Sequence, residues 1–327
     1  MPLSDVAALC LRSDPTLNPI HLIKPDGSHG GHWCQKITTE CTHCYAESQN
    51  QSNYFSFASH LKYSGAAPEN MILDEAVLKK ILKARSPKKV FMFSMTDVFG
   101  KWVSDEWIDT TFAYMALAKQ HTFQLLTKRA DRMFDYFKSG ARQRIRIKAV
   151  DIGRKLGLKY EIYEPYETFD FEFPLPNVWL GVSVGNQSAT HRIPYLLKSP
   201  AAVRFLSCEP LLELIDLRPH LRVYVGCQGC DFQGNHRLGK SEISWVIVGG
   251  ESGTEARPCH LDWIRSIISQ CQTANVPIFV KQLGSNPIDS NNYIIDVASN
   301  NFSLKLKDRK GGDISEFPEE LRIRQFP

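Results

Sequence analysis

Three cysteines in the first part of the chain have the spacing of a metal centre. Cys34, Cys41 and Cys44 form a C-x6-C-x2-C run. Structural zinc normally takes four protein ligands in a closed tetrahedron, so three thiolates leave one position free. A 4Fe–4S cluster held by three cysteines likewise has one iron open to a small molecule. If that molecule is S-adenosylmethionine, it chelates the open iron, and one electron from the cluster breaks its sulfonium bond to give a 5′-deoxyadenosyl radical.

Two other interpretations of these three cysteines stay open. The first is structural zinc, with the fourth ligand supplied by His32, His43 or the distant pair Cys227 and Cys230. The second is that the thiols bind no metal and serve packing or redox chemistry. The position of the loop, near the start of an alternation of strands and helices, favours the iron–sulfur cluster.

Cys227 and Cys230 form a separate C-x2-C pair, with His220 and His236 nearby. This arrangement resembles half of a zinc knuckle and predicts a small structural zinc site, with surface or packing cysteines as the alternative. The other four cysteines lie alone, and we expect them to be buried as small apolar side chains: Cys10, Cys208, Cys259 and Cys271.

The composition is that of a globular protein. The 327 residues are 43% hydrophobic and 23% charged, which excludes a disordered or collagen-like chain. No apolar run reaches the roughly 18 residues of a membrane span, and the first residues lack the pattern of a signal peptide. We therefore expect a cytoplasmic protein with reduced thiols. The net charge of +4 is too small to indicate nucleic-acid binding by itself.

Short apolar strands alternate with helical patterns along the chain, which predicts parallel strands buried on both faces. The expected helices include residues 74–84, 105–119 with Ser104 as its N-cap, and 261–274. No G-x-G-x-x-G turn is present, so we expect a full or partial (β/α) barrel, resembling that of radical S-adenosylmethionine enzymes, rather than a dinucleotide-binding sheet. The six expected strands are residues 90–95, 122–126, 178–184, 203–206, 245–248 and 277–280.

The length suits one barrel-like domain over residues 1–327. Two insertions interrupt the alternation, at about 138–170 and 220–242, and a charged tail at 305–327 is expected to cap the barrel loosely. The segment His21–Ile23 is the one candidate for a further strand before residue 40. The basic stretch from Arg142 to Lys155 has no interleaved aromatic residues, which favours a solvated helix face over a nucleic-acid contact.

Charged or amide side chains directly follow most of the expected strands. In a barrel the carboxyl ends of the strands meet at one rim, where active sites are built. We therefore expect a functional rim, against the alternative that strands simply end in polar residues. Its members are Asp97, Lys128, Arg129, Glu209, Glu251, Lys281 and Gln282.

Several segments together resemble a phage gp-thirty-seven-like family, a domain of unknown function found in phages and bacteria. The family is regarded as similar to radical S-adenosylmethionine enzymes, whose common motif is C-x3-C-x2-C; here the last two cysteines keep that spacing and the first lies three residues farther away. The segments that carry the resemblance are Gly31–Cys34, Cys41–Glu47, Phe93–Phe99, Gln120–Arg129, Asn177–Val184, Ser207–Leu212, Val246–Gly253 and Phe279–Gln282.

The resemblance implies roles for side chains around the cluster. Ser94, Thr96 and Asp97 are candidates for binding the amino group of S-adenosylmethionine, with an ordinary strand-to-helix turn as the alternative. His43 stands where an aromatic residue often touches the adenine. The Gly-Gly-Glu element of that superfamily follows its second strand, whereas here Gly249, Gly250 and Glu251 come four strands later.

Further roles follow from side-chain chemistry. Lys128 and Arg129 are candidates for the carboxylate of S-adenosylmethionine or a substrate phosphate. Glu209 and Glu251 are candidates for ribose hydroxyls or a cationic substrate group. Gly249 and Gly250 would let a ligand approach the backbone. Asp97, Lys128, Glu209 and Glu251 are the expected catalytic residues.

The sequence therefore predicts a radical S-adenosylmethionine enzyme that needs an external electron donor, with a substrate that nothing in the rim identifies; the phage association makes a nucleic acid or nucleotide attractive. One alternative is a zinc-stabilised, non-catalytic, nucleic-acid-associated phage accessory protein. Another is a barrel nuclease or hydrolase that uses Asp97, Glu209 and Glu251 with a divalent metal.

Overall fold

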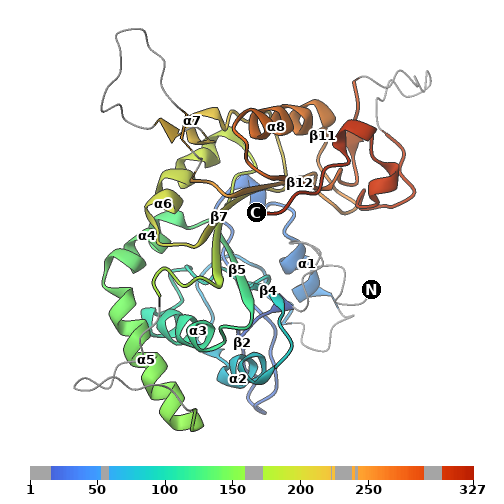
Figure 1. Ribbon diagram of the computed structural model, residues 1–327. Coiled ribbons are helices and arrows are strands. Elements are labelled where there is room, and N and C mark those ends of the chain that lie inside the picture. Colours follow the sequence, from blue (N-terminus) through green and yellow to red (C-terminus); the bar gives the residue numbers. More distant parts are fainter. Residues whose placement is uncertain are drawn as a thin grey trace, which may run out of the picture. The chain divides into compact units, whose positions relative to one another are not determined.

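The structure is a computed structural model that describes seven ranges of the chain (Figure 1). These ranges are 16–52, 59–158, 172–221, 223–224, 238–239, 242–290 and 304–327. Cys10, Cys227, Cys230 and His236 lie outside the described residues, so the second zinc site stays a prediction.

Seven strands form one sheet in the order β1-β4-β5-β6-β7-β10-β12. The pairs β1–β4, β4–β5, β7–β10 and β10–β12 are parallel. This confirms the predicted α/β class, while the order has two ends and no pairing among the described strands closes it into a full barrel. The strands are β1 (Thr16–Leu17), β4 (Lys89–Met92), β5 (Thr122–Thr127), β6 (Val178–Ser183), β7 (Val203–Cys208), β10 (Trp245–Gly249) and β12 (Ile278–Gln282).

The chain divides into two compact units. Unit 1 comprises residues 1–181 and 198–202, and unit 2 comprises residues 182–197 and 203–327. The prediction of a single domain stays a prediction, because a compact unit need not fold alone.

Unit 1 builds its helices on local signals that the sequence carries. The Ser104 side chain accepts a hydrogen bond from the backbone N–H of Trp107, which confirms it as the N-cap of the helix that follows. Asp74 caps the preceding helix in the same way, through the N–H of Ala76. The helices are α1 (Tyr45–Gln51), α2 (Glu75–Lys83), α3 (Asp105–Leu117), α4 (Ala130–Lys138) and α5 (Ala141–Leu156).

The first strand of the sheet is not the one that the sequence suggests. The candidate at His21–Ile23 forms β2 (Ile20–Leu22), which pairs antiparallel with β3 (Met71–Leu73) in a separate two-stranded sheet. The seventh strand of the main sheet is β1, only two residues long. A strand of that length shows no alternation that a sequence pattern could reveal.

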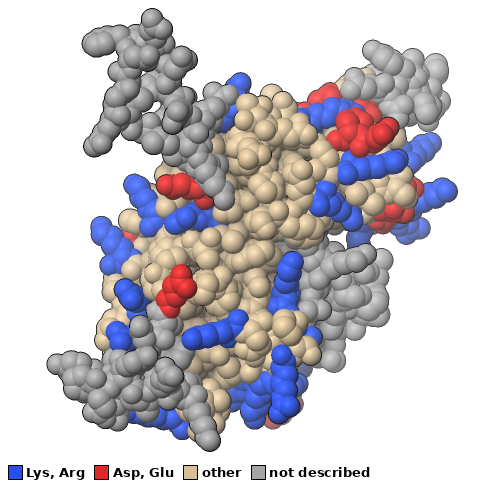
Figure 2. All heavy atoms as spheres, viewed as in Figure 1, with Lys and Arg blue, Asp and Glu red and all other residues tan. Residues whose placement is uncertain are grey.

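The basic stretch in the first insertion folds as α5 and packs on α3. Arg144 pairs with Asp109 at 2.9 Å and Lys148 with Glu106 at 3.0 Å, so α3 neutralises part of this charge. On the face drawn in Figure 2, basic side chains are spread over many elements. That face therefore shows no single basic patch suited to a nucleic acid.

Unit 2 carries the remaining α-helices that the structure describes and two short two-stranded sheets, β8 with β9 and β11 with β13. These elements are α6 (Ile193–Lys198), α7 (Arg218–Leu221), α8 (Leu261–Thr273), β8 (Val223–Tyr224), β9 (Leu238–Gly239), β11 (Cys259–His260) and β13 (Pro287–Ile288). Cys208, Cys259 and Cys271 are buried as predicted. No helix among the described residues is both long and apolar enough to cross a membrane.

The C-terminal tail is bound firmly to unit 2, so the predicted loose cap is wrong. Backbone hydrogen bonds of 2.8 and 2.9 Å join it to β12 at Val280 and Ile278. Phe317 and Leu321 in the tail are buried. The tail thus extends the edge of the sheet and buries apolar side chains. Its charged composition gave no indication of this packing.

Candidate metal centre

The three predicted ligand cysteines lie in unit 1, in the segment that leads into α1. Cys41 ends a short 3₁₀ helix (Thr39–Cys41), and Cys44 is the residue immediately before α1. Cys34, Cys41 and Cys44 are all half-buried free thiols. The loop follows β1 along the chain, as the predicted arrangement requires.

The three thiols interact electrostatically with one another, and their surroundings shift their pKa values in different directions. Burial, with a smaller contribution from the Asp97 carboxylate, raises the pKa of Cys34 to about 12. Burial also raises the pKa of Cys44. Burial opposes ionisation of Cys41 too, but the Lys128 ammonium and backbone hydrogen bonds lower the pKa of Cys41 below its usual value.

Lys128 is a cation whose charge acts on two of the three thiols. Its charge favours the thiolate forms of both Cys41 and Cys44. No hydrogen bond or ion pair engages its ammonium among the described residues, so that charge is available to the thiols or to a ligand. No group of three His, Cys, Asp or Glu in the described ranges is already gathered as it would be around a metal ion. The metal prediction therefore rests on the shared loop and its electrostatics.

An ion pair ties the two sides of the cysteine loop together. Lys36 pairs with Glu47 of α1 and also donates to the carbonyl of Thr42 at 3.1 Å. Glu47 accepts a hydrogen bond of 2.7 Å from the backbone N–H of Tyr63. These contacts fix the backbone conformation on both sides of Cys41.

The segment after β4 accepts hydrogen bonds from two tyrosines, one of them next to Cys44. Tyr45 donates to the carbonyl of Ser94 at 2.5 Å, and Tyr63 donates to that of Met95 at 2.9 Å. The backbone at Phe93 is left-handed, with φ of 61°, which is costly for a non-glycine residue. This local strain sits where the chain turns from β4 to present those two carbonyls.

A buried ion pair joins the loop to the end of β5. Arg129 contacts Asp97 at 3.1 Å, donates to the carbonyl of Gln35 at 2.8 Å, and stacks over the ring of Trp102. Asp97 also accepts from the Thr127 hydroxyl and from the backbone N–H groups of Phe99 and Lys128. The lone pairs of the Asp97 carboxylate are therefore largely occupied within the protein.

Two other predicted ligand contacts have internal partners as well. The Ser94 hydroxyl hydrogen-bonds the Asn18 side chain, and the Thr96 hydroxyl donates to the carbonyl of Trp33 at 2.8 Å. His43 is half-buried in the cysteine loop. The roles of Ser94, Thr96 and His43 toward S-adenosylmethionine remain predictions, whereas the structure brings all three into the unit that holds the cysteines.

The other predicted site residues lie in unit 2. Glu209 contacts Lys281 at 3.4 Å, and burial raises the pKa of Glu209 against the attraction of that lysine. Glu251 is buried and makes a two-pronged ion pair with Arg257, with a shortest contact of 2.6 Å. Each of the three carboxylates suggested for a metal-dependent nuclease therefore already faces a cation, because Asp97 faces Arg129.

The two glycines of the Gly-Gly-Glu element are needed for packing. A Cβ at Gly249 would lie 2.6 Å from Glu209 Oε1, and one at Gly250 would lie 2.3 Å from the carbonyl oxygen of Leu283. Gly250 thus allows two backbone segments to approach each other, and the role of both glycines toward a ligand stays a prediction. Gln282 is likewise engaged, donating to the Gly250 carbonyl at 2.7 Å.

Sequence reasoning missed the residues that brace the cysteine loop. Tyr45 is adjacent to Cys44, so its position was a usable signal. Trp102 gave no signal, because its partner Arg129 lies 27 residues farther along the chain, and Lys36 gave none, because many lysines could pair with Glu47.

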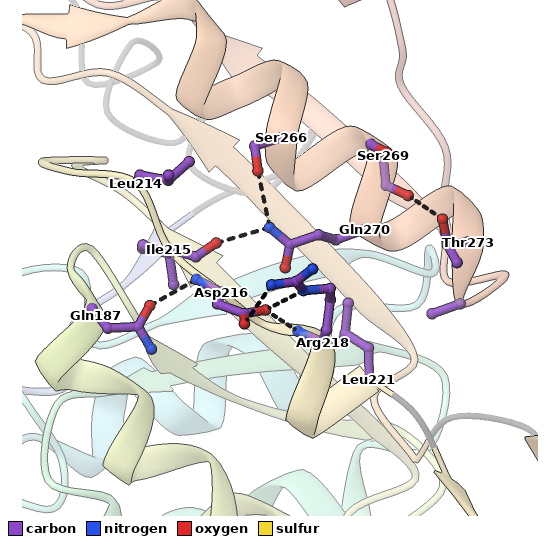
Figure 3. Close-up of a pocket in the computed structure, with 11 residues that line it drawn as sticks. Gln187, Leu214, Ile215, Asp216, Arg218, Leu221, Ser266, Ser269, Gln270 and Thr273 are labelled. Carbon is purple, nitrogen blue, oxygen red and sulfur yellow. Dashed lines mark hydrogen bonds and ion pairs between the residues drawn. The ribbon is translucent and has the colours of Figure 1, made fainter.

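Unit 2 also contains a cavity of about 540 Å³ (Figure 3). Gln270 of α8 points toward the loop at Ile215 and uses its whole amide there, accepting from Leu217 N–H and donating to the Ile215 carbonyl and to Ser266. Asp216 and Arg218 pair with each other. None of the predicted site residues lines this cavity.

Fold and site together define an α/β protein with a three-cysteine loop between the first strand of its parallel sheet and its first helix. The chain belongs to a family described as protein of unknown function, DUF5131, whose model matches residues 28–313. No curated protein and no solved structure matches the chain.

The acidities of the thiols predict which of them reacts first. In metal-free protein at pH 8, we expect iodoacetamide to alkylate Cys41 at least about tenfold faster than Cys34, because far more of Cys41 is thiolate. Lys128→Ala should slow the labelling of Cys41, while Lys101→Ala, at an exposed lysine, should not. Peptide mass spectrometry measures both rates, and faster labelling of Cys34 would contradict this assignment.

Proposed function

We propose that the protein is a radical S-adenosylmethionine enzyme in which Cys34, Cys41 and Cys44 hold a 4Fe–4S cluster. The observation that carries the proposal is a loop with three half-buried thiols in one another's field, with the Lys128 charge beside two of them. Three cysteines suit a cluster with one open iron. When bound, the cluster and S-adenosylmethionine together supply a 5′-deoxyadenosyl radical.

The residues around the loop prepare it to bind metal. Metal ligation requires deprotonated thiols, and Lys128 favours that state at Cys41 and Cys44. The contact of Arg129 with the Gln35 carbonyl fixes the backbone next to Cys34. Lys128 is our candidate for the carboxylate of S-adenosylmethionine, because its ammonium has no partner among the described residues, whereas Arg129 faces Asp97.

The wider setting of this activity is also proposed. The resemblance of segments between about residues 31 and 284 to a phage gp-thirty-seven-like family, and through it to radical S-adenosylmethionine enzymes, supports the assignment. Such an enzyme would work in a reducing cytoplasm with an external electron donor. A nucleic acid or nucleotide substrate is supported by the phage association alone.

Anaerobic purification tests the proposal. We expect a brown protein with about four irons per chain that yields 5′-deoxyadenosine when it is reduced in the presence of S-adenosylmethionine. A colourless protein that retains stoichiometric zinc after reconstitution with iron and sulfide would overturn the proposal and support the zinc alternative. Metal-dependent turnover that survives loss of Cys34 would instead support a hydrolase.

A further inference from the structure

Two buried oxygens in unit 2 have no hydrogen-bond partner among the described residues. They are Ser207 Oγ, near the end of β7, and Glu209 Oε1, one residue beyond that strand. Side chains two residues apart along a strand lie on one face of the sheet. Buried polar atoms in native proteins are rarely left unpaired, so two on one face indicate a partner beyond the residues that the structure describes.

The neighbouring strands explain why these oxygens stay unpaired. In the parallel register, Ser207 lies beside Ile247 of β10, and Ile247 lies beside Phe279 of β12, so the described strands on that side of β7 place apolar residues beside Ser207. One step farther along, Glu209 Oε2 meets Lys281 Nζ at 3.4 Å. The carboxylate lies over Gly249 of the intervening strand, where a Cβ would collide with Oε1 at 2.6 Å. The missing side chain of Gly249 therefore makes room for this group.

The same face of the sheet is covered at the other end of these strands. Phe326 of the tail stacks on Trp245 with ring centroids 6.2 Å apart, and Trp245 Nε1 donates to the Gln325 carbonyl at 2.9 Å. The polar atoms are thus confined to the carboxyl ends. There the side chains of Glu209 and Lys281 retain 8% and 12% exposure, so the group reaches the surface at one edge.

We propose that Ser207, Glu209 and Lys281 form a recognition site for a neutral, hydroxyl-rich ligand of the sugar or polyol class. The carboxylate and ammonium neutralise each other, so a phosphate would be repelled by Glu209 and an ammonium by Lys281. A hydroxyl both donates and accepts, so adjacent hydroxyls satisfy Glu209 Oε1, Ser207 Oγ and the remaining Lys281 donors. The last torsion of a glutamate is soft, which lets its free oxygen turn toward a ligand.

Binding of erythritol to the full-length, metal-free chain, followed by saturation-transfer NMR, tests this site. Erythritol has four adjacent hydroxyls, and 1,4-butanediol has the same carbon chain without the inner two. We expect erythritol to bind with a roughly millimolar dissociation constant and butanediol not to bind. Ser207→Ala and Glu209→Gln should each weaken erythritol binding at least about tenfold. Ser266→Ala, at a hydroxyl that is already hydrogen-bonded in the same unit, should bind erythritol like the wild type.

Three outcomes would overturn the site. These are no binding of erythritol to folded wild-type protein, equal binding by wild type and both variants, and equal binding of erythritol and butanediol. Urea unfolding curves establish that each variant is folded before it is scored. The site lies in unit 2 alone, so it stands or falls independently of the iron content that tests the three-cysteine centre.

Discussion

Cys41→Ala is expected to abolish cluster binding. A cluster held by three thiolates loses a third of its protein ligands in this variant, and Cys41 is the thiol with the lowered pKa. After anaerobic reconstitution we expect the iron content to fall from about four per chain to less than about one. Iron and sulfide assays and the visible absorption spectrum measure the loss. Cys34→Ala and Cys44→Ala should behave in the same way.

Cys259→Ala is the matched control for that series. Cys259 is buried in unit 2, where burial raises its pKa to about 12, and it lies outside the cysteine loop. This variant should keep the iron content of the wild type. A Cys41→Ala protein that still held a full cluster would refute the ligand assignment, and equal losses in Cys259→Ala would show that iron content follows folding rather than ligation.

The predictable part of the fold is the part that local sequence determines. Val90–Met92 and Trp245–Val248 are continuous apolar runs, because strands of a parallel sheet covered on both faces must be apolar throughout. Ser104 shows the N-terminus of α3 by its type and position. The strand Thr16–Leu17 carries no such local signal, because two residues are too few to show a periodic pattern. Its pairing with β4 is a contact between residues far apart in the sequence.

In the candidate site, too, the local features could be predicted from the sequence and the long-range contacts could not. The cysteine loop is predictable because all three thiols lie on one short segment. The carboxylates at strand ends look alike in sequence, but their partners separate them: Asp97 meets Arg129 from 32 residues away, and Glu209 meets Lys281 from 72 residues away. Only Glu209 keeps a buried carboxylate oxygen without a partner among the described residues.

Asp97→Ala is expected to be strongly destabilising, because Asp97 and Arg129 form a buried ion pair whose side chains are each 9% exposed. Removing one member of such a pair leaves an uncompensated buried charge, at a cost of about 3–5 kcal/mol. Arg129→Met should cost less, because the carboxylate keeps the Thr127 hydroxyl and two backbone N–H groups. Urea unfolding followed by tryptophan fluorescence measures both shifts.

The double variant and a surface control distinguish positioning from catalysis at Asp97. If the pair acts as a unit, Asp97→Ala with Arg129→Met should be no less stable than Asp97→Ala alone, since no unpaired charge is left. Asp131→Ala, at an exposed position on α4, should leave the unfolding curve unchanged. As a positioning residue, Asp97 should lose stability and iron content together, because Arg129 also holds the Gln35 carbonyl beside Cys34. An Asp97→Asn protein with wild-type stability and full iron content but no turnover would instead identify Asp97 as catalytic.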